Sequence, residues 1–186
     1  MIKVLLLADT HLGFDLPSRP RVDRRRRGPD FFASTRSALS PALAGEVDLV
    51  VHGGDLRFRS KVRPGLVALG LEPLLEVADR GVPVVLVPGN HERSALPYPL
   101  LAAHEHLHVL DRPRTVRLNL AGTRVAVGGF PCERIEGELS PGSERVLRAE
   151  ALRTLHPPSM TVVVRQRGTG CQATGPPARV DDKRQR

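Results

Sequence analysis

Three short polar segments of this 186-residue chain each follow directly on an apolar run rich in β-branched residues. The runs cover residues 2–8, 47–52 and 82–87, and the segments are Asp9-Thr10-His11, Gly53-Gly54-Asp55 and Gly89-Asn90-His91-Glu92. Asp9 and Asp55 are 46 residues apart, and Asp55 and Asn90 are 35 apart. Each spacing is long enough for one strand–helix–strand crossover, which takes about 30 residues. Because ligands of open α/β sheets bind outside the carboxyl ends of the strands, the three segments are predicted to meet at one site.

The rest of the pattern predicts an α/β fold. Apolar residues recur at helical spacing in residues 31–43 and 64–80, and helices are also expected at residues 96–104 and 143–155. Further strands are expected at residues 107–110, 115–120, 123–129 and 160–164, with a hairpin between the second and third of these. Residues 165–186 contain no Leu, Ile or Phe. We therefore expect a single domain over residues 1–164 and a disordered basic tail over residues 165–186.

The net charge of +8 is concentrated in that tail and in residues 17–29. Such basic runs indicate either contact with a polyanion or a solvated surface. The first run closely follows the predicted site, so we expect DNA contact there, whereas the tail is poor evidence for it. Five Phe, one Tyr and no Trp argue against an aromatic platform for single-stranded nucleic acid. The arginines of the first run are Arg19, Arg21, Arg24, Arg25, Arg26 and Arg27.

No apolar stretch reaches the roughly 18–20 residues of a membrane span. The two cysteines, Cys132 and Cys171, lie far apart and in no paired motif. A reduced, cytoplasmic protein without a membrane segment is therefore expected.

The three polar segments carry side chains suited to binding divalent metal ions. On an extended segment, Asp9 and His11 would project to the same side and could bind one ion. Asp55 has two oxygens with which to bridge two ions, Asn90 offers an amide oxygen, and His91 could donate a proton or hydrogen bond to a phosphate. Mixed oxygen and nitrogen ligands suit Mn, Fe or Zn, and two such ions would polarise a phosphoryl group and generate a hydroxide nucleophile.

Each segment also has a simpler interpretation. Alone, each is common turn chemistry, and only their order along the chain favours a metal centre. The alternating histidines His104, His106 and His108 likewise suit either a second metal site or solvated imidazoles, and we favour the latter.

Residues 8–13, 52–56 and 87–92 resemble the first three motifs of the calcineurin-like metallophosphoesterases, and in particular their DNA-repair exonuclease branch, which includes SbcD and Mre11. The resemblance covers about residues 1–165. It implies a four-layer α/β/β/α sandwich and a dinuclear, usually Mn-dependent, phosphodiester-hydrolysing site. Asp9 and His11 would then hold the first metal, Asp55 would bridge both, Asn90 would hold the second, and His91 would act as general acid or transition-state stabiliser. It further implies DNA as substrate and an SbcC/Rad50-like ATPase as partner.

The chain departs from that family in its last part. The family has a later His at the end of a strand and then a Gly-His-x-His turn, but here Arg165-Gln166 stands where His-Gln is usual and no such turn follows. A truncated or frameshifted gene is one explanation, leaving the fold and the second metal site incomplete, and a natural short variant is the other. We expect a metal-dependent phosphoesterase of the DNA-exonuclease type. The alternatives are an impaired or inactive fragment that binds DNA or a partner, and a phosphoesterase acting on small phosphodiesters or phosphoproteins.

Overall fold

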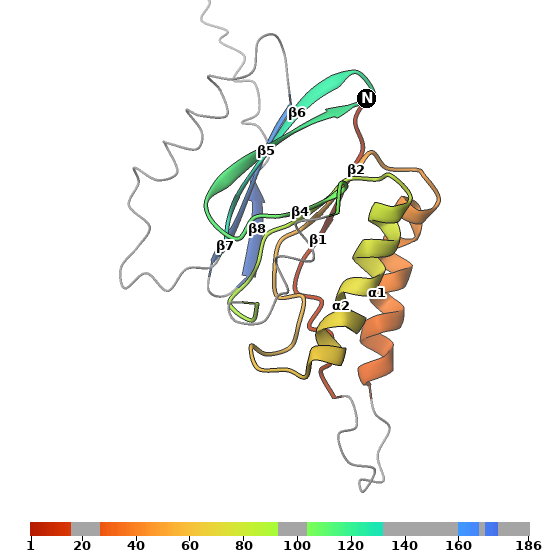
Figure 1. The fold of residues 1–186 in the computed structure, drawn as a ribbon, viewed down its shortest axis with the longest axis vertical. Helices are drawn as coiled ribbons and strands as arrows, with labels where there is room; N and C mark the ends of the chain where they lie inside the picture. Colours follow the sequence, from red (N-terminus) through yellow and green to blue (C-terminus); the bar gives the residue numbers. More distant parts are fainter. Residues whose placement is uncertain (16–26, 93–103, 132–159, 168–169, 175–186) are drawn as a thin grey trace, which may run out of the picture.

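The computed structural model describes residues 1–15, 27–92, 104–131, 160–167 and 170–174, which form two sheets and two helices (Figure 1). The helices α1 and α2 cover one face of the first sheet, and the second sheet lies against its other face. The described residues thus form α/β/β layers. The predicted α/β fold class is confirmed, and the fourth layer of the expected sandwich stays a prediction.

The first sheet is entirely parallel. In spatial order it contains β1 (Val4–Leu7), β2 (Leu49–His52), β3 (Val84–Leu86) and β4 (Leu107–Val109). Each strand falls within the run predicted for it. Because α1 (Gly28–Leu43) and α2 (Pro64–Asp79) return the chain to the start of the next strand, the carboxyl ends of β1, β2 and β3 lie at the same edge of the sheet.

Both helices agree with the predicted spans within a few residues. The helix α1 begins at Gly28 rather than at residue 31, with a proline in its first turn, and α2 begins directly at Pro64. Proline is well tolerated there because the first N–H groups of a helix have no partner within the helix. The helices expected at residues 96–104 and 143–155 lie outside the described residues. No helix in the described part of the chain is long and apolar enough to cross a membrane.

The strands β2 and β3 are buried on both faces, as near-continuous apolar runs predict, whereas β1 at the edge of the sheet is only partly buried. Val50, Val84 and Leu86 pack in the core that includes the helices. Val51 and Val85 point the other way, into the core shared with the second sheet. This double burial holds the carboxyl ends of β2 and β3, and so the second and third polar segments, on a rigid support.

The second sheet has the order β5 (Arg114–Leu120), β6 (Thr123–Phe130), β7 (Met160–Arg167) and β8 (Gly170–Thr174). The predicted hairpin of β5 and β6 is confirmed: the two strands pair antiparallel. The strand β7 pairs parallel with β6, and β8 pairs antiparallel with β7.

Two strands run into the segment expected to be disordered. The strand β7 continues to Arg167, and β8 occupies residues 170–174, so the boundary expected at residue 164 falls inside β7. The expectation of disorder is wrong for these residues. Strand pairing such as Arg165 with Gln172 satisfies backbone N–H and C=O groups whatever the side chains are, so a segment without an apolar pattern can still complete a sheet.

Candidate metal centre

The segments that follow β1 and β2 run alongside each other beyond the end of the sheet. The backbone N–H of Asp9 donates to the carbonyl of Gly54 at 3.0 Å, and that of His11 donates to the carbonyl of Asp55 at 3.0 Å. These bonds align the first two polar segments residue by residue. The sequence-based expectation that they meet at one edge of the sheet is therefore confirmed.

Asp9, His11 and Asp55 all have left-handed backbone conformations, with φ of 53°, 44° and 52°. Such conformations are uncommon for residues other than glycine and cost about 1–2 kcal/mol each. The extended segment predicted for Asp9 and His11 is therefore wrong. The side chains converge because the backbone turns sharply at each of them, with the inter-segment hydrogen bonds holding the strained turns in place.

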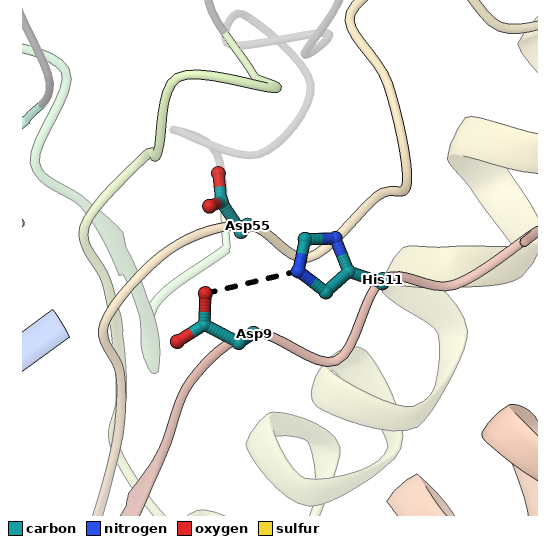
Figure 2. Close-up of side chains that lie close together, drawn as sticks. All are labelled: Asp9, His11 and Asp55. Carbon is teal, nitrogen blue, oxygen red and sulfur yellow. Dashed lines mark ion pairs between the residues drawn. The ribbon is translucent and has the colours of Figure 1, made fainter. Parts of the chain in front are cut away.

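The side chains of Asp9, His11 and Asp55 lie close together, and the His11 ring faces the Asp9 carboxylate (Figure 2). One ligand atom from each lies within 4.8 Å of the others, and His11 Nε2 is 3.8 Å from Asp9 Oδ1. Ligand atoms of one divalent ion lie up to about 4.4 Å apart, twice the usual bond length. Two carboxylates and one imidazole at this spacing therefore fit a divalent cation after a small side-chain adjustment.

The turn after β3 brings His91 to the same place. Its backbone N–H donates to Asp55 Oδ1 at 3.3 Å, and its ring lies edge-on to that of His11 with the centroids 5.4 Å apart. Asn90 is exposed on this turn, one residue before His91. The predicted catalytic residue thus lies beside the three candidate metal ligands, whereas the ligand role of Asn90 stays a prediction.

Glu92 links the turn after β3 to the segment after β2. Its Oε2 accepts hydrogen bonds from the N–H groups of Asp55 at 2.9 Å and Gly89 at 2.8 Å, and its Oε1 accepts one from the N–H of Arg57 at 2.9 Å. The Arg57 guanidinium, like Glu92 fully buried, lies 3.9 Å from Oε1 and donates to the carbonyl of His91. The Glu92 carboxylate therefore holds the backbone at Asp55 and Arg57 against the backbone at Gly89.

Burial raises the pKa of Glu92, and the backbone hydrogen bonds from Arg57 and Gly89 oppose that rise. Glu92 lies in the third polar segment, but nothing in the sequence indicates this acceptor role. The contact between the Glu92 carboxylate and the Arg57 guanidinium cannot be recognised from their spacing in the sequence, because it depends on how two distant segments pack.

His52, at the end of β2, is a second buried residue that the sequence analysis does not single out. Its Nδ1 accepts from the N–H of Gly54 at 3.2 Å, so the ring proton is on Nε2, which lies 3.1 Å from Thr10 Oγ1. The Thr10 hydroxyl donates onward to the carbonyl of Leu56 at 3.2 Å. Burial lowers the pKa of His52 to about 4, against an opposing effect of the Asp55 carboxylate. The neutral imidazole of His52 thus connects the first two polar segments through hydrogen bonds with Thr10 and Gly54.

Glycine at position 54 is required by the close approach of the second and third segments. Gly54 has φ of +106°, and a Cβ there would lie 2.8 Å from the backbone nitrogen of Gly89 and 2.9 Å from the carbonyl oxygen of Val87. No side chain fits at that distance. The glycine at this position therefore allows the segment after β2 to lie against the turn after β3.

The basic run predicted to contact DNA is described only at its end. Arg19, Arg21, Arg24, Arg25 and Arg26 lie outside the described residues. Arg27 is exposed, with its guanidinium 3.5 Å from the Asp30 carboxylate and its backbone N–H bonded to Asp15 Oδ2 at 3.1 Å. Contact of this run with DNA stays a prediction.

Of the three alternating histidines, His104 and His106 precede β4 and His108 lies within it, away from the carboxyl edge that carries the candidate metal ligands. His104 Nε2 is 3.0 Å from Asp79 Oδ1, and burial, followed by nearby Arg114, lowers the pKa of His108. Among the described residues, the one group of His, Cys, Asp or Glu side chains close enough to hold a metal is Asp9, His11 and Asp55. The three histidines do not form a second such site.

Comparison with known proteins agrees with this geometry. The family model described as calcineurin-like phosphoesterase matches residues 2–152, which include all three polar segments. The DNA double-strand break repair protein Mre11 of Haloferax volcanii is 38% identical over 95 residues, and that of Archaeoglobus fulgidus is 30% identical over 94. Each match covers 50% of this chain and 20% of the relative, so this chain matches about a fifth of the relatives' length.

The fold is shared with a solved structure. The crystal structure of TT1561 of Thermus thermophilus superposes with a TM-score of 0.57 at 15% sequence identity. The superposition covers 89% of this chain and 68% of that one. At this identity the likeness supports the α/β/β arrangement alone.

Proposed function

This chain belongs to the calcineurin-like phosphoesterase family, and on that premise we propose that it is a metal-dependent hydrolase that cleaves phosphodiester bonds of DNA. The observation that carries the proposal is the convergence of Asp9, His11 and Asp55 at the carboxyl edge of a parallel sheet. Relatives named for DNA double-strand break repair support DNA as the substrate class.

In this proposal Asp9, His11 and Asp55 hold one divalent ion, and Asp55 together with Asn90 holds a second. The oxygen and nitrogen donors suit Mn, Fe or Zn. When bound, such ions polarise a phosphoryl group and lower the pKa of water. Asp55 is only 7% exposed, so little water competes for its carboxylate and its attraction for a cation is strong.

His91 is the proposed catalytic residue. Its ring adjoins that of His11, within reach of a phosphate held at the metal centre. There it would donate a hydrogen bond or a proton to a phosphate oxygen as negative charge develops. The bonds from its N–H to Asp55 and from Arg57 to its carbonyl fix the backbone that carries the ring.

The test compares the parent chain with Asp55→Asn, which keeps the size of the side chain but removes its charge. With Mn²⁺ present, hydrolysis of bis-p-nitrophenyl phosphate and of single-stranded DNA is measured, together with bound metal by mass spectrometry. We expect Asp55→Asn to lower kcat/KM by more than about 100-fold and to lower the metal content, since a ligand should matter more than the outer-shell partners that cost 10–100-fold.

The matched control is Asp79→Asn, which changes a 72% exposed acid on α2 outside the candidate centre and should leave both readouts unchanged. Equal hydrolysis by the parent and Asp55→Asn would refute the site, and hydrolysis of the small diester without DNA would refute the substrate class. An ATPase partner of the SbcC/Rad50 type remains a prediction from the resemblance.

A further inference from the structure

Three of the five phenylalanines gather in one aromatic cluster, formed by Phe14, Phe31 and Phe58. The ring centroids of Phe14 and Phe31 are 5.6 Å apart with the planes at 68°, and those of Phe14 and Phe58 are 6.5 Å apart at 71°. Both pairs have the edge-to-face geometry that aromatic rings prefer. The low aromatic content of the chain therefore conceals a local concentration of rings.

This aromatic cluster is built on the two segments that carry the candidate metal ligands. Phe14 follows His11 by three residues and Phe58 follows Asp55 by three. The N–H of Phe14 donates to the carbonyl of His11 at 3.1 Å, and the N–H of Phe58 donates to the carbonyl of Leu12 at 3.2 Å. The cluster and the metal centre are therefore neighbours, held by the same backbone.

Phe14 is the member of the cluster that faces solvent. It is 52% exposed, whereas Phe31 and Phe58 are partly buried against other elements. A single exposed apolar side chain is common on proteins. Here, however, the exposed ring is supported by two others that fix its orientation, so it presents an apolar surface to the solvent beside the metal centre.

Exposed cations follow Phe58 in the chain. The Arg59 guanidinium lies 4.7 Å from the centroid of the Phe58 ring. Arg59, Lys61 and Arg63 are all exposed, and within the described part of the chain no ion pair involves any of them. Three exposed cations within five residues of Phe58 in the chain, one of them against its ring, complement a ligand that is both aromatic and polyanionic.

We propose that Phe14 is a stacking platform for an unpaired base of single-stranded DNA, with Arg59, Lys61 and Arg63 contacting its phosphates. The inference deepens the proposed function and rests on it. Stacking on aromatic side chains and phosphate contacts from a basic groove are how proteins hold single strands without reading their sequence. A base stacked on Phe14 would hold the strand next to Asp9, His11 and Asp55, where its phosphates can reach the metal centre.

The experiment measures binding apart from cleavage. Fluorescence anisotropy with Mn²⁺ present gives the Kd of the full chain for a labelled phosphorothioate oligothymidylate, which resists hydrolysis. The same strand with every base replaced by an abasic site is the second ligand. The variants are Phe14→Ala, Phe14→Leu and Phe14→Tyr, with Leu6→Ala as the control because Leu6 is similarly exposed at 49%.

We expect Phe14→Ala and Phe14→Leu to raise Kd for the oligothymidylate roughly 5- to 150-fold, the range for losing one stacked base. Phe14→Tyr, which keeps the ring, and the control Leu6→Ala should change Kd less than about twofold. The abasic strand should bind all variants alike. Replacing Arg59 by Ala should lower the salt dependence of log Kd by about 0.7, one phosphate contact, while Arg124→Ala on the β5–β6 hairpin should not.

The proposal is overturned if Phe14→Ala binds the oligothymidylate like the parent, if it weakens the abasic strand equally, or if the parent binds neither strand. Hydrolysis of bis-p-nitrophenyl phosphate by the parent, measured in parallel, reports on the metal centre alone. A failure of the platform with hydrolysis intact is thereby distinguished from a failure of the proposed function.

Discussion

Replacing Glu92 with Gln tests whether one buried carboxylate holds the second and third polar segments together. Gln has nearly the same shape, but only one of its two terminal atoms accepts hydrogen bonds. If the amide oxygen replaces Oε2, the amide nitrogen faces the N–H of Arg57, and if it replaces Oε1, the nitrogen faces the N–H groups of Asp55 and Gly89. In either orientation at least one buried donor loses its acceptor.

The expected cost follows from burial. A buried N–H group without an acceptor costs about 1–3 kcal/mol. The loss of the charge on Glu92 also removes the buried counter-ion of Arg57, and breaking one partner of such a pair costs about 3–5 kcal/mol. Both side chains are 0% exposed, so water does not screen the pair. Since Arg57 keeps its bond to the carbonyl of His91, we expect Glu92→Gln to lower the free energy of unfolding by about 3–5 kcal/mol.

Urea unfolding at pH 7, followed by far-UV circular dichroism because the chain has no tryptophan, measures this change. The control is Glu76→Gln, which removes an exposed partner of Arg36 at 3.0 Å and should cost less than about 1 kcal/mol. Most domains have a stability of about 5–15 kcal/mol, so Glu92→Gln should still fold. If it costs no more than Glu76→Gln, then Glu92 does not hold the two segments together and the role inferred for it is wrong.

Two further predictions concern neighbouring residues. Gly54→Ala should lower the free energy of unfolding in urea by about 1–3 kcal/mol more than Gly81→Ala does. Both glycines have positive φ, but of these two positions only 54 would bring a Cβ against backbone atoms. Equal losses would contradict the close approach to Gly89. The pKa of His52 is about 4 in the folded protein and 6.5 in the unfolded chain. As the pH falls below 6.5, the unfolded chain therefore binds the proton first, and the free energy of unfolding decreases until about pH 4. Between pH 7 and pH 5 this group should account for about 2 kcal/mol, a loss that His52→Gln should lack; identical pH dependence in the two proteins would refute the assignment.

Local periodicity explains how much of the fold the sequence predicts. The apolar run that contains β3 indicates a strand buried on both faces, and the crossover lengths between β1, β2 and β3 indicate a parallel sheet. The aligned carboxyl ends of these strands follow from that topology alone. The approach of Asp9 and His11 to Asp55 was therefore predictable, although the backbone conformation that produces it was not.

Strand β8 shows where such reasoning fails. Gln172 and its neighbours carry no hydrophobic period, and they are ordered by backbone pairing with β7, which needs no apolar pattern. Composition likewise argues against an aromatic platform, because a count of rings does not report that Phe14, Phe31 and Phe58 come together from three separate segments.

The amino-acid sequence alone sets the order of the elements, the apolar runs that form the strands and the residue types at the carboxyl edge of the sheet. These features depend on chain neighbours and on a repeating period. Only the tertiary structure decided the left-handed turns at Asp9, His11 and Asp55, the acceptor role of Glu92 and the tautomer of His52. Each of these depends on which buried donors and acceptors from distant segments face one another, and that is settled when the layers pack.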